Sequence, residues 1–361
     1  MKDRISYLAI VLLSILVLFI ASIFIEPIPI GEPEFITARV LSIEDVIEIE
    51  MPDESILTFI YFYAQTSEGH TVEGEMMLST FFGDDLRAVS VGDRIILALP
   101  TDGYDFYEFS GFVRTMPIYV LTSIFILSIL IFGRKKGFNA VISLGLTAAC
   151  IFFLFVPAIL GGANIRVAAL LVCVYVVIST LLIVEGFTKK GVTSIISCFV
   201  AIFFSGIILV FMENILNLTS LIGVEASHLY GLIDLNAVTF AAILIGSLGA
   251  IMDIAVSISS SLWELSESSD NFNFSSSMSS GTNIGKDILG TMLNTLVLAY
   301  IGSYLLIVLS LVHNEVISYE FFNRDVMLVE FLRILIGSIG IFITIPISTV
   351  ICSYIYRKEK I

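Results

Sequence analysis

Apolar blocks of about 20 residues recur along this chain, and they constrain its fold more than any other feature. A helix of about 20 apolar residues crosses the hydrocarbon core of a bilayer, because it satisfies its backbone hydrogen bonds internally. Only 14% of the residues are charged, against about 25% in soluble domains. The sequence therefore predicts an α-helical polytopic membrane protein with about eight transmembrane helices. The blocks cover residues 7–25, 117–132, 140–160, 167–184, 192–212, 238–262, 288–312 and 326–354.

The segment between the first two blocks has a different pattern. From Glu26 to Met116 it holds 18 acidic and 4 basic residues, so it carries most of the net charge of −15. Short apolar stretches alternate there with turn residues, as in VIEIEM and GDRIILAL. We expect five strands forming a small extracytoplasmic β-barrel or sandwich domain, OB-like, inserted between helices 1 and 2. Its acidity disfavours nucleic acid as a partner but would concentrate cations. The five stretches are FITARVLSI, VIEIEM, ILTFIYFYAQT, HTVEGEMML and GDRIILAL.

The distribution of Lys and Arg predicts how the chain is oriented. With eight spans, nearly all basic residues of the short loops fall on one side, and the other side holds only Arg166 and Arg324. Basic loops face the cytoplasm. We therefore expect a multi-pass protein of the cell membrane with both termini cytoplasmic. The predicted domains are an N-terminal transmembrane helix at 1–25, an acidic extracytoplasmic β domain at 26–115 and a seven-helix membrane domain at 116–361.

Motifs for catalysis and cofactor binding are missing from the sequence. The four cysteines lie inside apolar blocks, where they are interpreted as small buried hydrophobic side chains. The three histidines are scattered, and neither a zinc spacing nor a phosphate-binding loop is present. We expect no metal, no cofactor and no enzymatic activity.

The sixth block carries a carboxylate within an apolar helix. An Asp at the centre of an inserted helix costs about 2.5–3.5 kcal/mol, so such residues usually face protein or water. Asp253 belongs to a stripe with spacings of 3, 4, 4, 3 and 4 residues, which lie on one helix face. The glycines of the stripe favour close helix packing, whereas the carboxylate and the hydroxyls indicate a polar site. The stripe consists of Gly246, Gly249, Asp253, Ser257, Ser260 and Glu264.

The seventh and eighth blocks carry similar faces. On the seventh, we expect Thr291 or Asn294 to meet Asp253, because the two helices are antiparallel neighbours. On the eighth, Glu330 and Arg333 can form an ion pair. The simplest arrangement turns all three faces toward a common interior. The faces consist of Asn283, Asp287, Thr291 and Asn294 on the seventh block and of Glu330, Arg333, Gly337, Gly340, Thr344 and Ser348 on the eighth, with Gly290 as a further packing residue.

The stretch GSLGAIMDIAVSISSSLWEL, followed by GTNIGKDILGTMLNTLVLAYIGS, resembles the YibE/F-like family of bacterial membrane proteins. The resemblance implies a multi-pass membrane protein with a short extracytoplasmic β-region before the membrane core. The Ser-rich linker between the two motif halves, which we expect to be flexible or loosely helical, departs from the family pattern. The motif maps onto Gly246, Gly249, Asp253, Ser257, Ser259, Gly285, Asp287, Gly290, Thr291, Asn294 and Thr295.

Three functions fit these features. The first is a transporter or permease for a small solute or ion, with a pathway formed by Asp253, Ser257, Ser260, Asp287, Thr291 and Asn294. The second is a non-catalytic assembly protein, whose β domain binds an envelope partner. The third is an intramembrane aspartyl hydrolase using Asp253 and Asp287, although the sequence IGKD departs from the GxGD pattern. The partners expected are the lipid bilayer, a small solute or cation, and a second copy or an envelope component.

Overall fold

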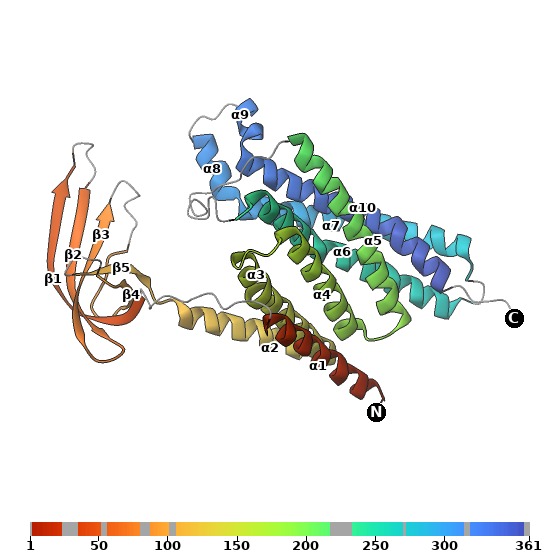
Figure 1. Cartoon of the computed structure of the whole chain (residues 1–361), viewed down its shortest axis with the longest axis horizontal. Coiled ribbons are helices and arrows are strands. Elements are labelled where there is room, and N and C mark those ends of the chain that lie inside the picture. The colour runs from red at the N-terminus through yellow and green to blue at the C-terminus, as the bar shows by residue number, and fades with distance from the viewer. Residues whose placement is uncertain are drawn as a thin grey trace. The chain divides into compact units, whose positions relative to one another are not determined.

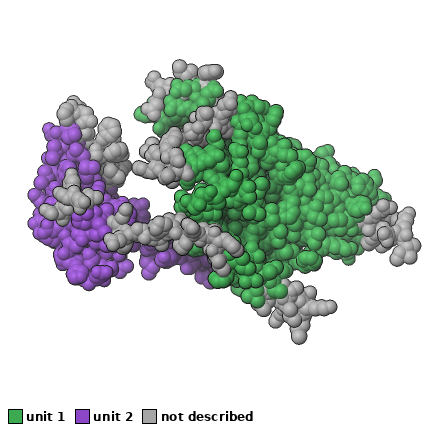
Figure 2. Space-filling model, in the orientation of Figure 1, with its two compact units in different colours: residues 1–28, 132–361 green, residues 29–131 purple. Residues whose placement is uncertain are grey.

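The structure is a computed structural model in which the chain divides into two compact units. Residues 29–131 form one unit, and residues 1–28 with 132–361 form the other (Figure 2). Each unit has its own hydrophobic core and is described separately below. The residues that the structure describes are 2–23, 35–51, 56–79, 87–100, 106–216, 233–269, 272–313 and 318–356.

The smaller unit contains a closed five-stranded barrel, so of the expected barrel or sandwich the barrel is confirmed (Figure 1). The strand order is β1-β2-β3-β5-β4, and β4 pairs with β1 to close the barrel. Phe62, Ile95 and Leu97 are fully buried in its core. Gly74 lies against Phe62, whose ring leaves no space for a side chain there. The strands are β1 (Phe35–Glu50), β2 (Ile56–Thr66), β3 (Thr71–Ser79), β4 (Arg94–Ala98) and β5 (Tyr107–Phe112).

One of the strand predictions was wrong, and one strand was missed. The stretches FITARVLSI and VIEIEM form the single strand β1, because register shifts at 40–42 and 43–45 absorb the break in alternation between them. Strand β5 was not predicted, since its six residues include Gly111 and show only a short alternation. Its pairing with β4 and, in parallel, with β3 stabilises it instead.

The larger unit consists of apolar helices, and six helices of the described residues are long and apolar enough to cross a membrane. The apolar part of α1, at 9–21, is shorter. The helices, with one π-helical turn η2, are α1 (Lys2–Ile23), α2 (Thr115–Cys150), η2 (Ile151–Phe155), α3 (Val156–Leu160), α4 (Ile165–Glu185), α5 (Lys189–Leu216), α6 (Leu235–Ser268), α7 (Phe274–Ser303), α8 (Leu305–His313), α9 (Ser318–Asn323) and α10 (Asp325–Ile355).

The second and third predicted spans are joined in one helical segment, Thr115–Leu160. A straight helix of its 46 residues would measure about 69 Å, against about 30 Å for the hydrocarbon core. The segment breaks at Arg134, whose backbone (φ 48, ψ −120) is not helical. Each part is about as long as one crossing requires. The described residues contain six helices that could cross a membrane, and the count of eight spans is therefore still a prediction.

Helix α10 lies at the centre of the larger unit, where it contacts α5, α6 and α7. The linker expected between the sixth and seventh spans is largely helical, because α6 continues to Ser268 and α7 already begins at Phe274. Asn273 and Ser276 form a capping box that starts α7, with Asn273 Oδ1 accepting a hydrogen bond from the Ser276 amide at 2.9 Å. The sequence predicted a flexible or loosely helical linker there, since serine and asparagine are common in turns, and the structure has the helical alternative.

Candidate functional site

The stripe predicted on the sixth span is the exposed face of α6. Gly246, Gly249, Asp253 and Glu264 are exposed, and Ser257 and Ser260 are half-buried. The opposite faces of α6 are among the most buried surfaces of the unit, and Ile251, Ile254, Ile258 and Leu262 have no exposure. The stripe is therefore a narrow polar surface on a helix whose most apolar window is 50% buried by the rest of the chain.

The Asp253 carboxylate forms no hydrogen bond or ion pair with any residue that the structure describes. It lies close enough to the buried Cys198 thiol of α5 to interact with it electrostatically. At the end of the stripe, Glu264 is 3.6 Å from the Lys190 ammonium group, also on α5. The carboxylate at the centre of the stripe is thus available to a solute, an ion or water.

The polar face predicted on the seventh span is also exposed. Asn283, Asp287, Thr291 and Asn294 all lie on the surface of α7, and so does Gly290. Only 11% of the most apolar window of α7 is buried, the lowest share among the six long helices of the described chain. The Thr291 hydroxyl donates to the Ile288 carbonyl of its own helix at 2.9 Å. No hydrogen bond among the described residues joins Thr291 or Asn294 to Asp253, contrary to our expectation of a direct contact.

The face predicted on the eighth span is buried, unlike the other two. Glu330 and Arg333 form the expected ion pair, with 2.8 Å between the carboxylate oxygen and the guanidinium nitrogen. Thr344 and Ser348 are fully buried, and the Thr344 hydroxyl donates to the Gly340 carbonyl at 2.6 Å. A common interior for all three faces is therefore wrong for the described chain, because the small residues of α10 pack against α5, α6 and α7 instead of lining a cavity with Asp253.

The predicted packing glycines divide into two groups. At Gly340 a β-carbon would lie 2.9 Å from Ile251 and 3.0 Å from the Ser205 hydroxyl, and at Gly337 it would lie 3.2 Å from Leu296. Gly246 lies against the Tyr300 hydroxyl, where a β-carbon would be at 2.8 Å. By contrast, a β-carbon at Gly249 or Gly290 would meet nothing within 4 Å. Gly249 and Gly290 lie on exposed faces, so close packing within the described chain does not explain why glycine occupies these positions.

The sequence analysis did not predict the buried hydroxyl contacts to α10. The Thr193 hydroxyl of α5 lies 2.6 Å from the Tyr356 hydroxyl, just past the end of α10. The Ser353 hydroxyl donates to Ser277 of α7 at 2.7 Å. Single serines and threonines in apolar helices give only a weak signal, since each is also satisfied by its own helix backbone. These contacts hold α10 in place.

A polar cluster at the end of the bundle where α5 ends and α6 begins was also missed. Arg166 at the start of α4 pairs with Glu213 of α5 at 3.3 Å. With Asn236 and Thr239 of α6 they line a cavity of about 120 Å³, whose other lining residues are Val210 and Asn214. The pairing joins residues 47 positions apart, so no spacing rule could have indicated it.

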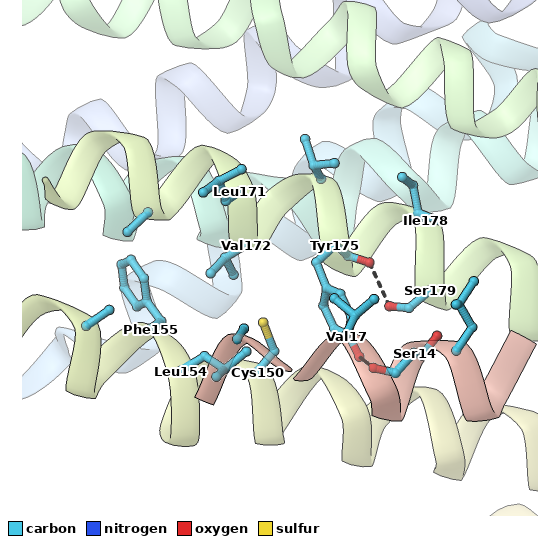
Figure 3. Close-up of a pocket in the computed structure, with 15 residues that line it drawn as sticks. Ser14, Val17, Cys150, Leu154, Phe155, Leu171, Val172, Tyr175, Ile178 and Ser179 are labelled. Carbon is cyan, nitrogen blue, oxygen red and sulfur yellow. Dashed lines mark hydrogen bonds between the residues drawn. The ribbon is translucent and has the colours of Figure 1, made fainter. Parts of the chain in front are cut away.

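An apolar cavity of about 480 Å³ lies between α1, α4 and the segment around η2 (Figure 3). Phe155, Val172 and Tyr175 contribute to its walls, and the Tyr175 hydroxyl donates to the Ser14 carbonyl of α1 at 3.3 Å. None of the residues predicted for the polar site lines this cavity. Its apolar walls fit an acyl chain or a neighbouring apolar side chain, not a charged solute.

Metal-binding geometry is not found within the described ranges, where no three His, Cys, Asp or Glu side chains come together. The cysteines are buried and free, as their interpretation as small hydrophobic residues predicts. In the barrel, the carboxylates of Glu73 and Glu44 raise the pKa of Tyr63 above its usual value, because they favour the neutral phenol.

Comparisons with known proteins extend the resemblance seen in the motifs. The model of a family described as YibE/F-like protein matches residues 121–358, about two thirds of the chain, which include all of the α6 and α7 faces described above. No curated protein and no solved structure matches the chain.

Proposed function

This chain belongs to the YibE/F-like family, and on that premise we propose that it is a membrane transporter or permease for a small solute or ion and not an enzyme. The observation that carries the proposal is the position of Asp253. Its carboxylate lies on the exposed strip of a half-buried apolar helix, without a hydrogen-bonding partner in the described parts of the chain. Lipid cannot solvate such a group, so the strip must face water or a second protein surface.

The polar groups beside Asp253 favour a pathway over an isolated charge. Ser257 and Ser260 continue the strip along α6, and α7 exposes Asp287, Thr291 and Asn294. Hydroxyl, amide and carboxylate oxygens can replace part of the hydration shell of a small polar solute. In this proposal Asp253 binds a cation or proton, and the hydroxyls of Ser257, Ser260 and Thr291 bind the rest of the solute.

A second copy of the chain is the proposed cover for the exposed face of α7. Residues 283, 287, 290, 294, 297 and 301 are separated by 4, 3, 4, 3 and 4 positions, which is the spacing of a left-handed coiled-coil seam. In a two-fold dimer the two α7 helices run in the same direction, so Asn294 faces Asn294 of the other copy. Asn pairs form interhelical hydrogen bonds in membranes. Lys286 flanks the seam beside Asp287, where its charge offsets the repulsion between the two facing Asp287 carboxylates, and the open space at Gly290 allows close approach.

Cysteine cross-linking tests this dimer. Gly290→Cys in full-length protein, oxidised in native membranes, should give a disulfide-linked dimer, because the seam brings equivalent positions together. Phe203→Cys is the matched control, since Phe203 is 64% exposed on α5 but lies outside the seam. Cross-linking at Phe203 to the same extent, or none at Gly290, would contradict the dimer.

For orientation, we propose cytoplasmic termini and an extracytoplasmic barrel. The support is the excess of Lys and Arg on one side of the predicted spans. The acidic barrel would then raise the cation concentration outside the membrane, an effect that weakens with ionic strength. Protease protection of the barrel in right-side-out vesicles would contradict this orientation.

Flux in proteoliposomes tests the transport proposal. Full-length protein is reconstituted with a trapped pH-sensitive dye or with radiolabelled Na⁺ or K⁺, and gradients of each ion are imposed in turn. We expect flux that is lost in Asp253→Asn and retained in Glu267→Gln, which removes a carboxylate at the far end of the same helix. Equal flux in the wild type and Asp253→Asn contradicts the role of Asp253. Absence of flux for all three ions in the wild type contradicts an ion transporter.

A second candidate function is membrane assembly through the barrel, which one feature of β1 favours. Residues 41–50 are all exposed, and they include Leu41, Ile43, Val46, Ile47 and Ile49. Strand β4 pairs with β1 at 35–39, and no described strand pairs with the rest of that edge, which another strand could therefore extend. Deleting residues 34–112 separates the two functions. A deleted protein that still moves solute disfavours assembly as the main role.

A further inference from the structure

The polar cavity where α5 ends and α6 begins contains two oxygen atoms without a partner. Glu213 Oε1 and Asn236 Oδ1 are buried, and neither forms a hydrogen bond with any described residue. The Glu213 side chain is only 9% exposed. Both atoms are acceptors, so neither can satisfy the other. A buried acceptor left alone is costly, so each of these atoms favours a donor or a cation in the cavity.

The residues around the cavity fix its charge. Arg166 pairs with the second oxygen of Glu213, and its guanidinium group also lies 5.9 Å from the centre of the Phe240 ring. Asp234 is exposed and does not line the cavity, but it is close enough to Glu213 to interact with it electrostatically. One cationic and two anionic side chains leave a net charge of −1. A single positive charge would neutralise the cluster.

We propose that this cavity is a binding site for a small monovalent cation of the size of Na⁺. Glu213 Oε1, Asn236 Oδ1 and the hydroxyl of Thr239 are the hard oxygen donors available to it. Calcium takes six to eight oxygen ligands, commonly from several carboxylates, and here one carboxylate already shares its charge with Arg166. The cavity of about 120 Å³ has room for the ion and several waters.

This site is separate from the α6 strip and does not depend on transport. The cavity lies at the beginning of α6, where Glu213, Asn236 and Thr239 line it. Asp253 is 14 positions past Thr239 on the same helix, about 21 Å by helical rise. Asp234 holds that first turn by accepting hydrogen bonds from the amides of Asn236 and Ala237 at 3.1 and 3.2 Å. A cation bound here would tie α5 to α6 at this end of the bundle.

Binding of radiolabelled Na⁺ to purified full-length protein in detergent tests the site without any transport measurement. We expect saturable binding that unlabelled NaCl displaces and that N-methylglucamine chloride, whose cation exceeds the cavity, does not. Glu213→Gln and the isosteric Thr239→Val should each weaken binding at least tenfold. The matched control is Glu320→Gln, which removes a carboxylate that pairs with Arg324 at 2.6 Å on an exposed surface. This control should bind like the wild type.

Two outcomes overturn the proposal. Wild-type protein that binds no Na⁺ saturably shows that the cavity is not a Na⁺ site. Binding that is equal in the wild type, Glu213→Gln and Thr239→Val places the ion elsewhere. Each variant is first checked for a single symmetric peak in size-exclusion chromatography. If Glu213→Gln fails that check, Thr239→Val decides the result, because it keeps the Arg166–Glu213 pair.

Discussion

Replacing Gly340 by alanine tests how closely α10 packs at the centre of the bundle. The new β-carbon would lie 2.9 Å from Cδ1 and 3.2 Å from Cγ1 of Ile251, where carbon atoms prefer about 3.5–4.0 Å. Ile251 is fully buried and cannot move aside freely. Overpacking of this kind costs about 1–3 kcal/mol. Alanine in place of glycine also stabilises a helix by about 0.5–1 kcal/mol, so the net effect of one variant is smaller.

The comparison with Gly249→Ala removes that second effect. Gly249 is on the neighbouring helix α6, and a β-carbon there meets nothing within 4 Å. The two variants gain similar helix propensity, so their difference in unfolding free energy isolates the overpacking term of about 1–3 kcal/mol. Unfolding can be followed through the single tryptophan, Trp263, which packs edge-to-face on Tyr356 at 5.2 Å. Gly340→Ala that is as stable as Gly249→Ala would refute the packing of α10 described above.

Two further predictions concern single hydroxyls. Tyr356→Phe removes the buried hydrogen bond to Thr193 and should lower stability by about 0.5–1.5 kcal/mol in the same Trp263 assay, since Thr193 can still donate to its own helix backbone; an unchanged midpoint would contradict it. In the barrel, Glu73→Gln should lower the pKa of Tyr63, read from the ultraviolet difference between titrations with and without Tyr63→Phe. Because folding raises this pKa, the stabilising contribution is present below the unfolded pKa near 10 and is lost as pH rises through the folded value. A Tyr63 titration that Glu73→Gln leaves unchanged would contradict the assigned cause.

The helices of the larger unit could be read from the sequence because a bilayer imposes a length and a composition on each crossing. The expected span at 326–354 is close to α10, Asp325–Ile355. The interruption between the predicted spans 117–132 and 140–160 is found at Arg134, but as a kink inside one helical segment where the basic residues indicated a loop. In the barrel, β5 depends on partners distant in sequence, which local alternation cannot show.

The sequence predicted which residues of the candidate site share a helix face, but not which neighbouring residues those faces contact. Periodicity showed that Asp253 shares a face with Gly249 and Ser257, and the structure has all three on the exposed side of α6. Periodicity does not say which neighbour a face meets, so the expected contact with Asn294 did not follow from it. The pairing of Arg166 with Glu213 was unreadable for the same reason, because it depends on how separate helices pack.

The most direct test of the proposed pathway is the water accessibility of the α6 strip. Cysteine is introduced at Ser257 or Ser260 in full-length protein in native membranes, and labelling by a membrane-impermeant maleimide is measured. The four native cysteines are buried, so background labelling should be low. A water-lined strip predicts labelling at both positions and none at Phe203→Cys, which is exposed on an apolar face of α5. No labelling at Ser257 and Ser260, or equal labelling at Phe203, would contradict the pathway.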